Sequence, residues 1–399
     1  MRTRITFTGD LLAYRSLIQK SNKGKGHDFS SVFADARSLF DESDYVVGNL
    51  ETPLAGKGAG YTVMDMLFNT PDSFARDAKN AGFNMFTTAN NHCMDKGEDG
   101  LKRTLDVLDE MGIDHTGTFR SNKEKRFIVK DINGIKFSFV SFTYGTNPNV
   151  NGYEINEGND YLVNLIKHPD EVYKRPFIKQ VIVNILYRLP LRVQNAIHPL
   201  YPAHGFDDNV PAKEIGNIQN KKYEDNFIEI IKAAKRESDI VIVCLHSGGQ
   251  FNSKVGEYTN YLIDMVRKQS VDVLIVNHPH CVLGSKWDKN VFEAYALGNF
   301  CFTPEEGYFI DGVYGEYGVV LNLDYDTEEK KLIDVSFSVI KNVRSHDGKE
   351  RVVPVSELYK ELTSEGQELL LRDVKQVICR FVGRDVENAI LERYSHSKL

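Results

Sequence analysis

Polar side chains follow five separate strand-like segments of this sequence, each at the point where an apolar run ends. The five clusters are Gly9-Asp10, Asn49-Leu50-Glu51, Asn90-Asn91-His92, His246 and His278-Pro279-His280. In α/β sheets the carboxyl ends of parallel strands meet at one edge, and ligands bind outside that edge. The pattern therefore predicts an α/β fold that gathers residues far apart in the sequence into one site.

The segments between these clusters alternate between helical and strand-like periodicity. Residues 97–111 place Leu101, Leu105 and Leu108 on one helical face. Asn133-Gly134 is a strong hairpin turn signal between two strand-like runs within residues 126–142. Other helices are expected near 30–41, 71–81, 221–237, 257–269 and over 356–394. Other strands are expected at 3–8, 45–47, 83–88, 239–245, 271–276, 291–297, 317–324 and 332–340.

Residues 145–220 interrupt this alternation and are predicted to be an insertion, because long irregular segments in compact domains are usually functional. Within it, residues 174–193 carry five basic side chains and no acidic one. Two interpretations are a cap packed on the main domain, which we favour, and a peripheral contact with anionic lipid or an acidic polymer. We expect a domain of residues 1–344 that includes the insertion, followed by a helical C-terminal extension of residues 345–399.

Composition narrows the class of partner and the compartment. With 49 basic and 56 acidic residues, the net charge is -7. This balance argues against a nucleic-acid binder, which needs excess basic residues. Five cysteines without a Cys-x-x-Cys pair fit a reducing compartment. No apolar run approaches the roughly 20 residues that span a bilayer, and the N-terminus has no signal-like core. We therefore expect a cytoplasmic protein, with membrane association only through residues 174–193.

The five clusters combine carboxylate, amide oxygen and imidazole, a set that suits a divalent metal such as Mn, Zn or Fe. A carboxylate such as Glu51 can bridge two metals, and a histidine that is not a ligand can protonate a leaving group. The sequence has no Gly-x-Ser-x-Gly elbow and no phosphate-binding or dinucleotide glycine motif. Cys93 and Cys281 adjoin histidines, but sequence neighbours in a strand point to opposite faces, which argues against a Cys/His nucleophile.

Three motifs resemble those of the bacterial capsule-synthesis CapA family, which is associated with poly-γ-glutamate capsules. They are Gly9-Asp10, the run from Gly48 to Pro53, and the run from Ala89 to Gly97. His246-Ser247-Gly248, Asn277–His280 and Leu297–Phe300 extend the resemblance over residues 3–302, apart from the insertion. CapA proteins are similar to calcineurin-like metallophosphatases. The resemblance therefore implies an α/β (α+β) protein with a four-layer α/β/β/α sandwich, an inserted cap and a helical C-terminal tail.

The resemblance also implies a site with one or two divalent ions (Mn, Zn, Fe or Mg). Glu51 would bridge two ions, and His92 would be the general acid. The other ligands would divide into Asp10 and His280 for one ion, and Asn91, His246 and His278 for the other. The remaining polar residues of the motifs are expected to contact the substrate: Asn49, Asn90, Asp95 and Asn299.

Three positions depart from the motifs of these relatives. Leu12 stands where metallophosphatases usually have a histidine, so one metal position lacks a ligand. Glu51 replaces the usual aspartate, and Gln250 replaces a frequent glutamate. Two classes of function follow: a hydrolase acting on a phosphoester or a γ-glutamyl amide, and a non-catalytic module that handles an anionic polymer in capsule assembly or export. We favour the hydrolase, because a pure binder needs no general acid such as His92.

Overall fold

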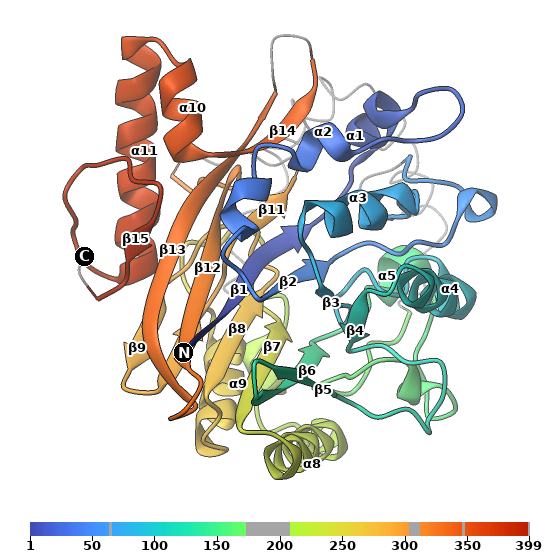
Figure 1. The fold of residues 1–399 in the computed structure, drawn as a ribbon. Coiled ribbons are helices and arrows are strands. Elements are labelled where there is room, and N and C mark those ends of the chain that lie inside the picture. Colours follow the sequence, from blue (N-terminus) through green and yellow to red (C-terminus); the bar gives the residue numbers. More distant parts are fainter. Residues whose placement is uncertain (64–65, 173–207, 303–311, 345–347, 398–399) are drawn as a thin grey trace.

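The computed structural model describes residues 1–63, 66–172, 208–302, 312–344 and 348–397. Two sheets pack face to face, and helices cover their outer surfaces (Figure 1). One core joins Phe7 and Val47 of the first sheet to Phe139 and Ile242 of the second. Separate apolar clusters lie between each sheet and its own helices. The predicted α/β/β/α sandwich is therefore confirmed.

The first sheet has nine strands, and its central strands are parallel. β1 contains a register shift between Phe7 and Asp10, an irregularity of the kind that re-aims a side chain at a strand end. The main order is β14 (Glu350–Pro354), β13 (Lys331–Arg344), β12 (Tyr317–Asp326), β1 (Arg2–Leu11), β2 (Tyr45–Leu50), β3 (Met85–Thr87) and β4 (Asp114–Thr116), with β11 (Asn299–Cys301) beside β1 and β15 (Tyr394–Ser395) beside β13.

The second sheet has six strands and begins with the predicted hairpin. Asn133 and Gly134 both have positive φ, 54° and 86°, as the tight two-residue hairpin turn requires. The order is β5 (Ile128–Ile132), β6 (Ile135–Thr143), β7 (Ile240–His246), β8 (Val273–Asn277), β10 (Val291–Ala294) and β9 (Ser285–Asp288), with β6, β7, β8 and β10 parallel.

The helices cover the sheets through one apolar face each. In α8, Phe227, Ile230 and Ile231 are buried in the same cluster as β6 and β7. Within the described residues the α-helices are α1 (Arg15–Ser21), α2 (Ser30–Phe33), α3 (Ser73–Ala81), α4 (Gly97–Glu110), α5 (Pro148–Asn151), α8 (Lys221–Glu237), α9 (Glu257–Lys268), α10 (Val355–Glu361) and α11 (Ser364–Val382). Short 3-10 turns occur at Arg37–Phe40, Lys57–Ala59, Asp160–Leu162, Ala212–Glu214 and Ile218–Asn220.

Two helical predictions are wrong in extent. The helix expected at 30–41 is the short α2 followed by a separate 3-10 turn. The helix expected through 394 ends at Val382, because Gly383 adopts a left-handed conformation with φ 71°. The chain then returns as β15 against β13, and the division at residue 344 stays a prediction.

Residues 174–193, predicted as a cap or a membrane contact, lie outside the described residues. Of the helices that the structure does describe, none combines the length and the apolar character needed to cross a bilayer.

Two backbone segments approach each other closely beside the first polar cluster. Asp10 N–H donates to the carbonyl oxygen of Gly298 at 3.0 Å, which pairs β1 with β11. A Cβ added at Gly9 would lie 1.9 Å from that carbonyl oxygen. Only glycine at position 9 therefore allows the two strands to pair here, and this pairing fixes where Asp10 and Asn299 lie.

Gly9→Ala is therefore expected to push β1 away from β11. Overpacking of this kind lowers the free energy of unfolding by about 1–3 kcal/mol, which urea denaturation would measure. Gly58→Ala is the control, since a Cβ there meets no atom within 4 Å. Equal stability of the two variants would contradict this account of Gly9.

Candidate metal centre

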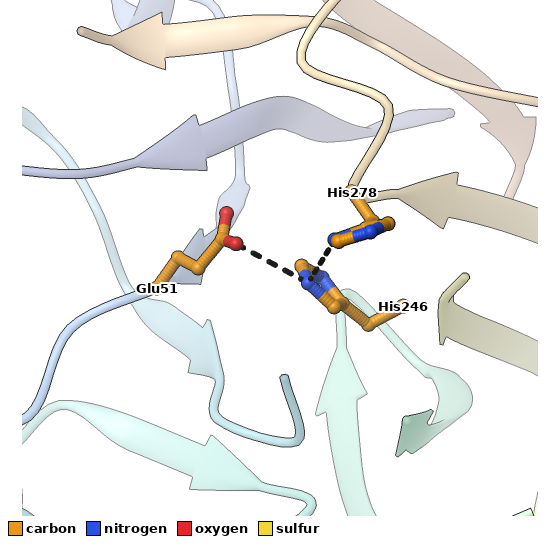
Figure 2. Close-up of side chains that lie close together, drawn as sticks. All are labelled: Glu51, His246 and His278. Atoms are coloured by element: carbon orange, nitrogen blue, oxygen red, sulfur yellow. Dashed lines mark hydrogen bonds and ion pairs between the residues drawn. The ribbon is translucent and has the colours of Figure 1, made fainter. Parts of the chain in front are cut away.

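The two sheets bring the polar clusters together at the carboxyl ends of their parallel strands. Asp10 lies near the end of β1, and Glu51 directly follows β2. His246 is the last residue of β7, and His278 follows β8. In Figure 2 the side chains of Glu51, His246 and His278 point toward one another from separate elements. The predicted convergence of distant residues is thus a feature of the structure.

Two groups of three potential ligands share Glu51. The first is Glu51, His246 and His278, and the second is Asp10, Glu51 and His280. Within each group one ligand atom per residue lies within 4.8 Å of the others. Glu51 Oε1 lies 3.3 Å from His246 Nε2 and 3.7 Å from His280 Nε2. Glu51 thus occupies the central position expected of a bridging ligand.

The carboxylate of Glu51 is the strongest sign that a cation belongs here. The residue is fully buried, and among the described residues neither carboxylate oxygen has a hydrogen-bond partner. Burying a charge without hydrogen bonds or a counterion is costly. Three imidazoles and a second carboxylate surround it, so the donor set fits a divalent metal ion.

The histidines respond differently to this environment. Burial, together with the neighbouring imidazoles, holds the pKa of His278 well below its ordinary value. Burial alone would also lower the pKa of His280, but the carboxylates of Glu51 and Asp10 outweigh it and raise that pKa to about 9. Without a metal, the two carboxylates therefore draw a proton onto His280. A bound cation would supply that positive charge instead.

The loop that carries two of these histidines is strained. His278 has φ 106° and His280 has φ 54°, values that non-glycine residues rarely adopt. Backbone with positive φ, rather than an extended segment, therefore turns both imidazoles toward Glu51. Such strain costs about 1–3 kcal/mol per residue and clusters at functional sites.

His92 forms a buried pair with Asp95 beside the proposed ligands. His92 Nδ1 lies 2.8 Å from Asp95 Oδ2, which also accepts the backbone N–H of Phe68 at 2.7 Å. The Phe68 ring packs edge-on against His92, with centroids 4.6 Å apart. Burial opposes protonation, yet the charge and hydrogen bond of Asp95 raise the pKa of His92 overall. The protonated imidazole is the form a general acid needs.

Asn49 and Asn299 contact the proposed ligands Asp10 and His280, and Asn91 lies beside His246 as a further candidate ligand. Asn49 Nδ2 donates to Asp10 Oδ1 at 2.7 Å, and Asn299 Oδ1 lies 2.9 Å from His280 Nδ1. Asn91 Oδ1 lies 2.8 Å from His246 Nε2, and Asn90 Nδ2 donates to the carbonyl of Leu50 at 2.8 Å. Such partners fix the orientation of metal ligands. The contacts with substrate expected of Asn49, Asn90, Asp95 and Asn299 stay predictions.

Sequence reasoning missed Asn209 and Tyr144. Asn209 Nδ2 lies 2.6 Å from His278 Nε2 and 2.9 Å from Tyr144 Oη, and the Tyr144 ring packs against His278 with centroids 5.0 Å apart. Tyr144 directly follows β6, so its position at a strand end was a usable signal. Asn209 lies in the insertion, where no periodicity marks it.

Comparison with known proteins finds one matching family, and the similar curated proteins include two named CapA. A model of the family described as bacterial capsule synthesis protein PGA_cap matches residues 4–304. The chain is 24% identical over 300 residues to the PGA biosynthesis protein CapA of Bacillus subtilis (strain 168), which covers 74% of this chain and 62% of that protein. It is 23% identical over 302 residues to the capsule biosynthesis protein CapA of Bacillus anthracis, covering 75% and 59%. The matched region thus spans about three fifths of these relatives.

Solved structures with a partial likeness include a phosphatase from Mycoplasma pneumoniae, with a TM-score of 0.40 and 13% identity, covering 86% of this chain and 94% of that one. Another is the 5'-nucleotidase from Candida albicans SC5314, with a TM-score of 0.38 and 12% identity, covering 94% of this chain and 56% of that one.

The family match includes every one of the predicted ligands, from Asp10 to His280, together with His92 and Asn299. It also extends over well more than half of the chain. This chain therefore belongs to the bacterial capsule synthesis protein PGA_cap family.

Proposed function

We propose that this chain is a metal-dependent hydrolase that acts in the biosynthesis of a bacterial capsule, such as poly-γ-glutamate. The observation that carries the proposal is the buried carboxylate of Glu51, which is shared by two ligand groups and lacks a hydrogen-bond partner among the described residues. The His92–Asp95 pair beside it gives the site a proton donor as well as ligands. A module that only bound a polymer would need no such donor.

Two divalent ions fit the ligands best, with Glu51 between them. His246, His278 and the amide oxygen of Asn91 would hold one ion, and Asp10 and His280 the other. The imidazole-rich set favours Mn, Zn or Fe over Mg. When bound, such ions act as Lewis acids and make water more acidic, which suits attack on a phosphoester or a γ-glutamyl amide.

The residues of the chain divide the remaining work. Asp95 accepts the Nδ1 proton of His92 and thereby directs the opposite ring nitrogen, Nε2, toward proton transfer. His92 then donates the Nε2 proton to the leaving group as its bond breaks. Asn49 keeps Asp10 in position through the 2.7 Å hydrogen bond, so that the ligand does not rotate away.

Metal content tests the ligand assignment. Elemental analysis of the wild type is expected to find divalent metal. His246→Ala should remove the ion near His278, Asp10→Ala the ion near His280, and Glu51→Ala should lower both. His115→Ala is the control, because His115 pairs with Asp109 outside the two ligand groups. Full metal content in both Glu51→Ala and His246→Ala would refute the assignment.

The role of His92 predicts an effect on rate without loss of metal. His92→Asn is expected to lower kcat by about 10²–10⁴-fold, because general acid catalysis contributes that much. The loss should be small for a nitrophenyl phosphodiester, whose leaving group needs no proton, and large for an alkyl one.

Two further variants sharpen this test. Asp95→Asn should reduce kcat in the same substrate-dependent way, since Asp95 acts through His92, and His115→Asn should leave kcat unchanged. If His92→Asn slows both leaving groups equally, or releases the metal, His92 is not the general acid.

A further inference from the structure

A second polar cavity lies away from the metal centre, between the start of β5 and the first turns of α8. Its volume is about 360 Å³. β5 is an edge strand of the second sheet, and Figure 1 shows α8 below it in this view. None of the proposed metal ligands lines it. Its polar lining consists of Asn122, Arg126, Asp160, Tyr161, Lys222 and Asn226.

Arg126 is the unusual member of this lining. It is half-buried. In the described part of the chain, no carboxylate oxygen lies within 4.0 Å of its guanidinium nitrogens, the distance that defines an ion pair. Its guanidinium stacks on the Phe119 ring, 4.1 Å from the centroid, and Nη1 donates to the carbonyl oxygen of Tyr161 at 2.5 Å. Three other half-buried arginines bond a carboxylate at 2.6–2.7 Å: Arg103, Arg120 and Arg351. Arg380 resembles Arg126, since its printed hydrogen bonds go to carbonyl oxygens.

The cavity therefore contains a positively charged side chain, Arg126, most of whose N–H donors are unused within the described chain. A guanidinium has five N–H groups, and Arg126 uses one in its hydrogen bonds within the described chain. Asp160, the one carboxylate of the lining, is held by Lys222 at 2.7 Å. One positive charge thus remains over the lining as a whole. Burial lowers the pKa of Arg126 to about 10, although the negative charges of Asp160 and Glu124 partly oppose this shift.

The cavity also lies at the same end of the second sheet as the metal centre, the end where β6, β7 and β8 finish. Arg126 precedes β5 at the end where β6 finishes, and Asn164 Nδ2 donates to the carbonyls of both Arg126 and Ser141 at 3.0 Å. In turn, Thr143 of β6 pairs with His246 of β7. β5 and β7 are two strand spacings apart, about 10 Å.

We propose that this cavity binds a carboxylate or phosphate group, held by the free N–H donors of Arg126 and by the amides of Asn122 and Asn226. Planar guanidinium groups bind both anions through paired hydrogen bonds. Because the cavity and the metal centre lie at the same end of the sheet, one substrate could reach both. The cavity would then bind a second anionic group of the substrate whose reacting group lies at the metal centre. That assignment, unlike the anion site itself, rests on the proposed function.

Calorimetry on the full chain treated with a chelator tests the site without any contribution from metal. The probes are γ-linked oligoglutamate and inorganic phosphate, in separate titrations. Arg126→Gln should weaken binding by about 10- to 100-fold, since a hydrogen bond to a charged group contributes about that much. Arg126→Lys should retain part of the affinity, and binding should weaken as salt rises.

Arg236→Gln is the matched control, an exposed arginine on α8 that does not line the cavity. Oligoglutamate binding alone would identify a carboxylate site, and phosphate binding alone a phosphoryl site. Absence of binding by both probes, or equal affinity in wild type and Arg126→Gln, would overturn the proposal. Binding that depends on Arg126, in a protein that hydrolyses no phosphoester or γ-glutamyl substrate, would keep the anion site and reject the hydrolase.

Discussion

The buried carboxylate of Glu51, which lacks a hydrogen-bond partner among the described residues, is the constraint on which the rest of the site depends. A buried carboxylate without hydrogen bonds destabilises a fold unless a cation or a proton accompanies it. Here the surrounding groups are themselves buried, with His280 the most exposed of the ligands at 4%. Solvent therefore offers little screening, and the charge must be balanced inside the site. Without a metal, the raised pKa of His280 lets its imidazole hold a proton that balances this charge. A metal ion would balance the charge and also contact the other donors.

The two-sheet architecture makes this concentration of charge sustainable. Four strands from two sheets each contribute or directly precede a ligand, so the ligands are held by rigid backbone rather than by flexible loops. Gly9 permits β1 and β11 to touch, and Asp10 and Asn299 pair across that contact. The left-handed conformations of His278 and His280 persist because strands on both sides fix the ends of their loop. The extensive core between the sheets thus offsets the energetic cost of strain in this one short loop.

The sequence predicted the site better than its surroundings, for a physical reason. Residues at the ends of apolar strands carry two signals at once, the periodicity of the strand and a polar side chain that breaks it. Asp10, Glu51, His246 and His278 have both. Asn209 has neither, because it contacts His278 from a loop whose path depends on tertiary packing. Arg126 begins a strand-like run, but nothing in that pattern marks the cavity that it lines. Short strands such as β9 and β11 were missed for a similar reason, since three or four residues are too few to show a period.

The two ligand groups are not equivalent, and the difference has a consequence for how ions enter. The group around His246 includes the amide oxygen of Asn91, 2.8 Å from the imidazole, as a further donor. The group around Asp10 gains no such donor: Leu12 is apolar and buried, and the oxygen of Asn299 contacts Nδ1 of His280 rather than the shared space near Glu51. Because affinity rises with the number of well-placed donors, the position at His246 and His278 should fill first. An ion bound there would neutralise Glu51, and a second ion would then be attracted less strongly, so we predict only partial occupancy of the Asp10 position.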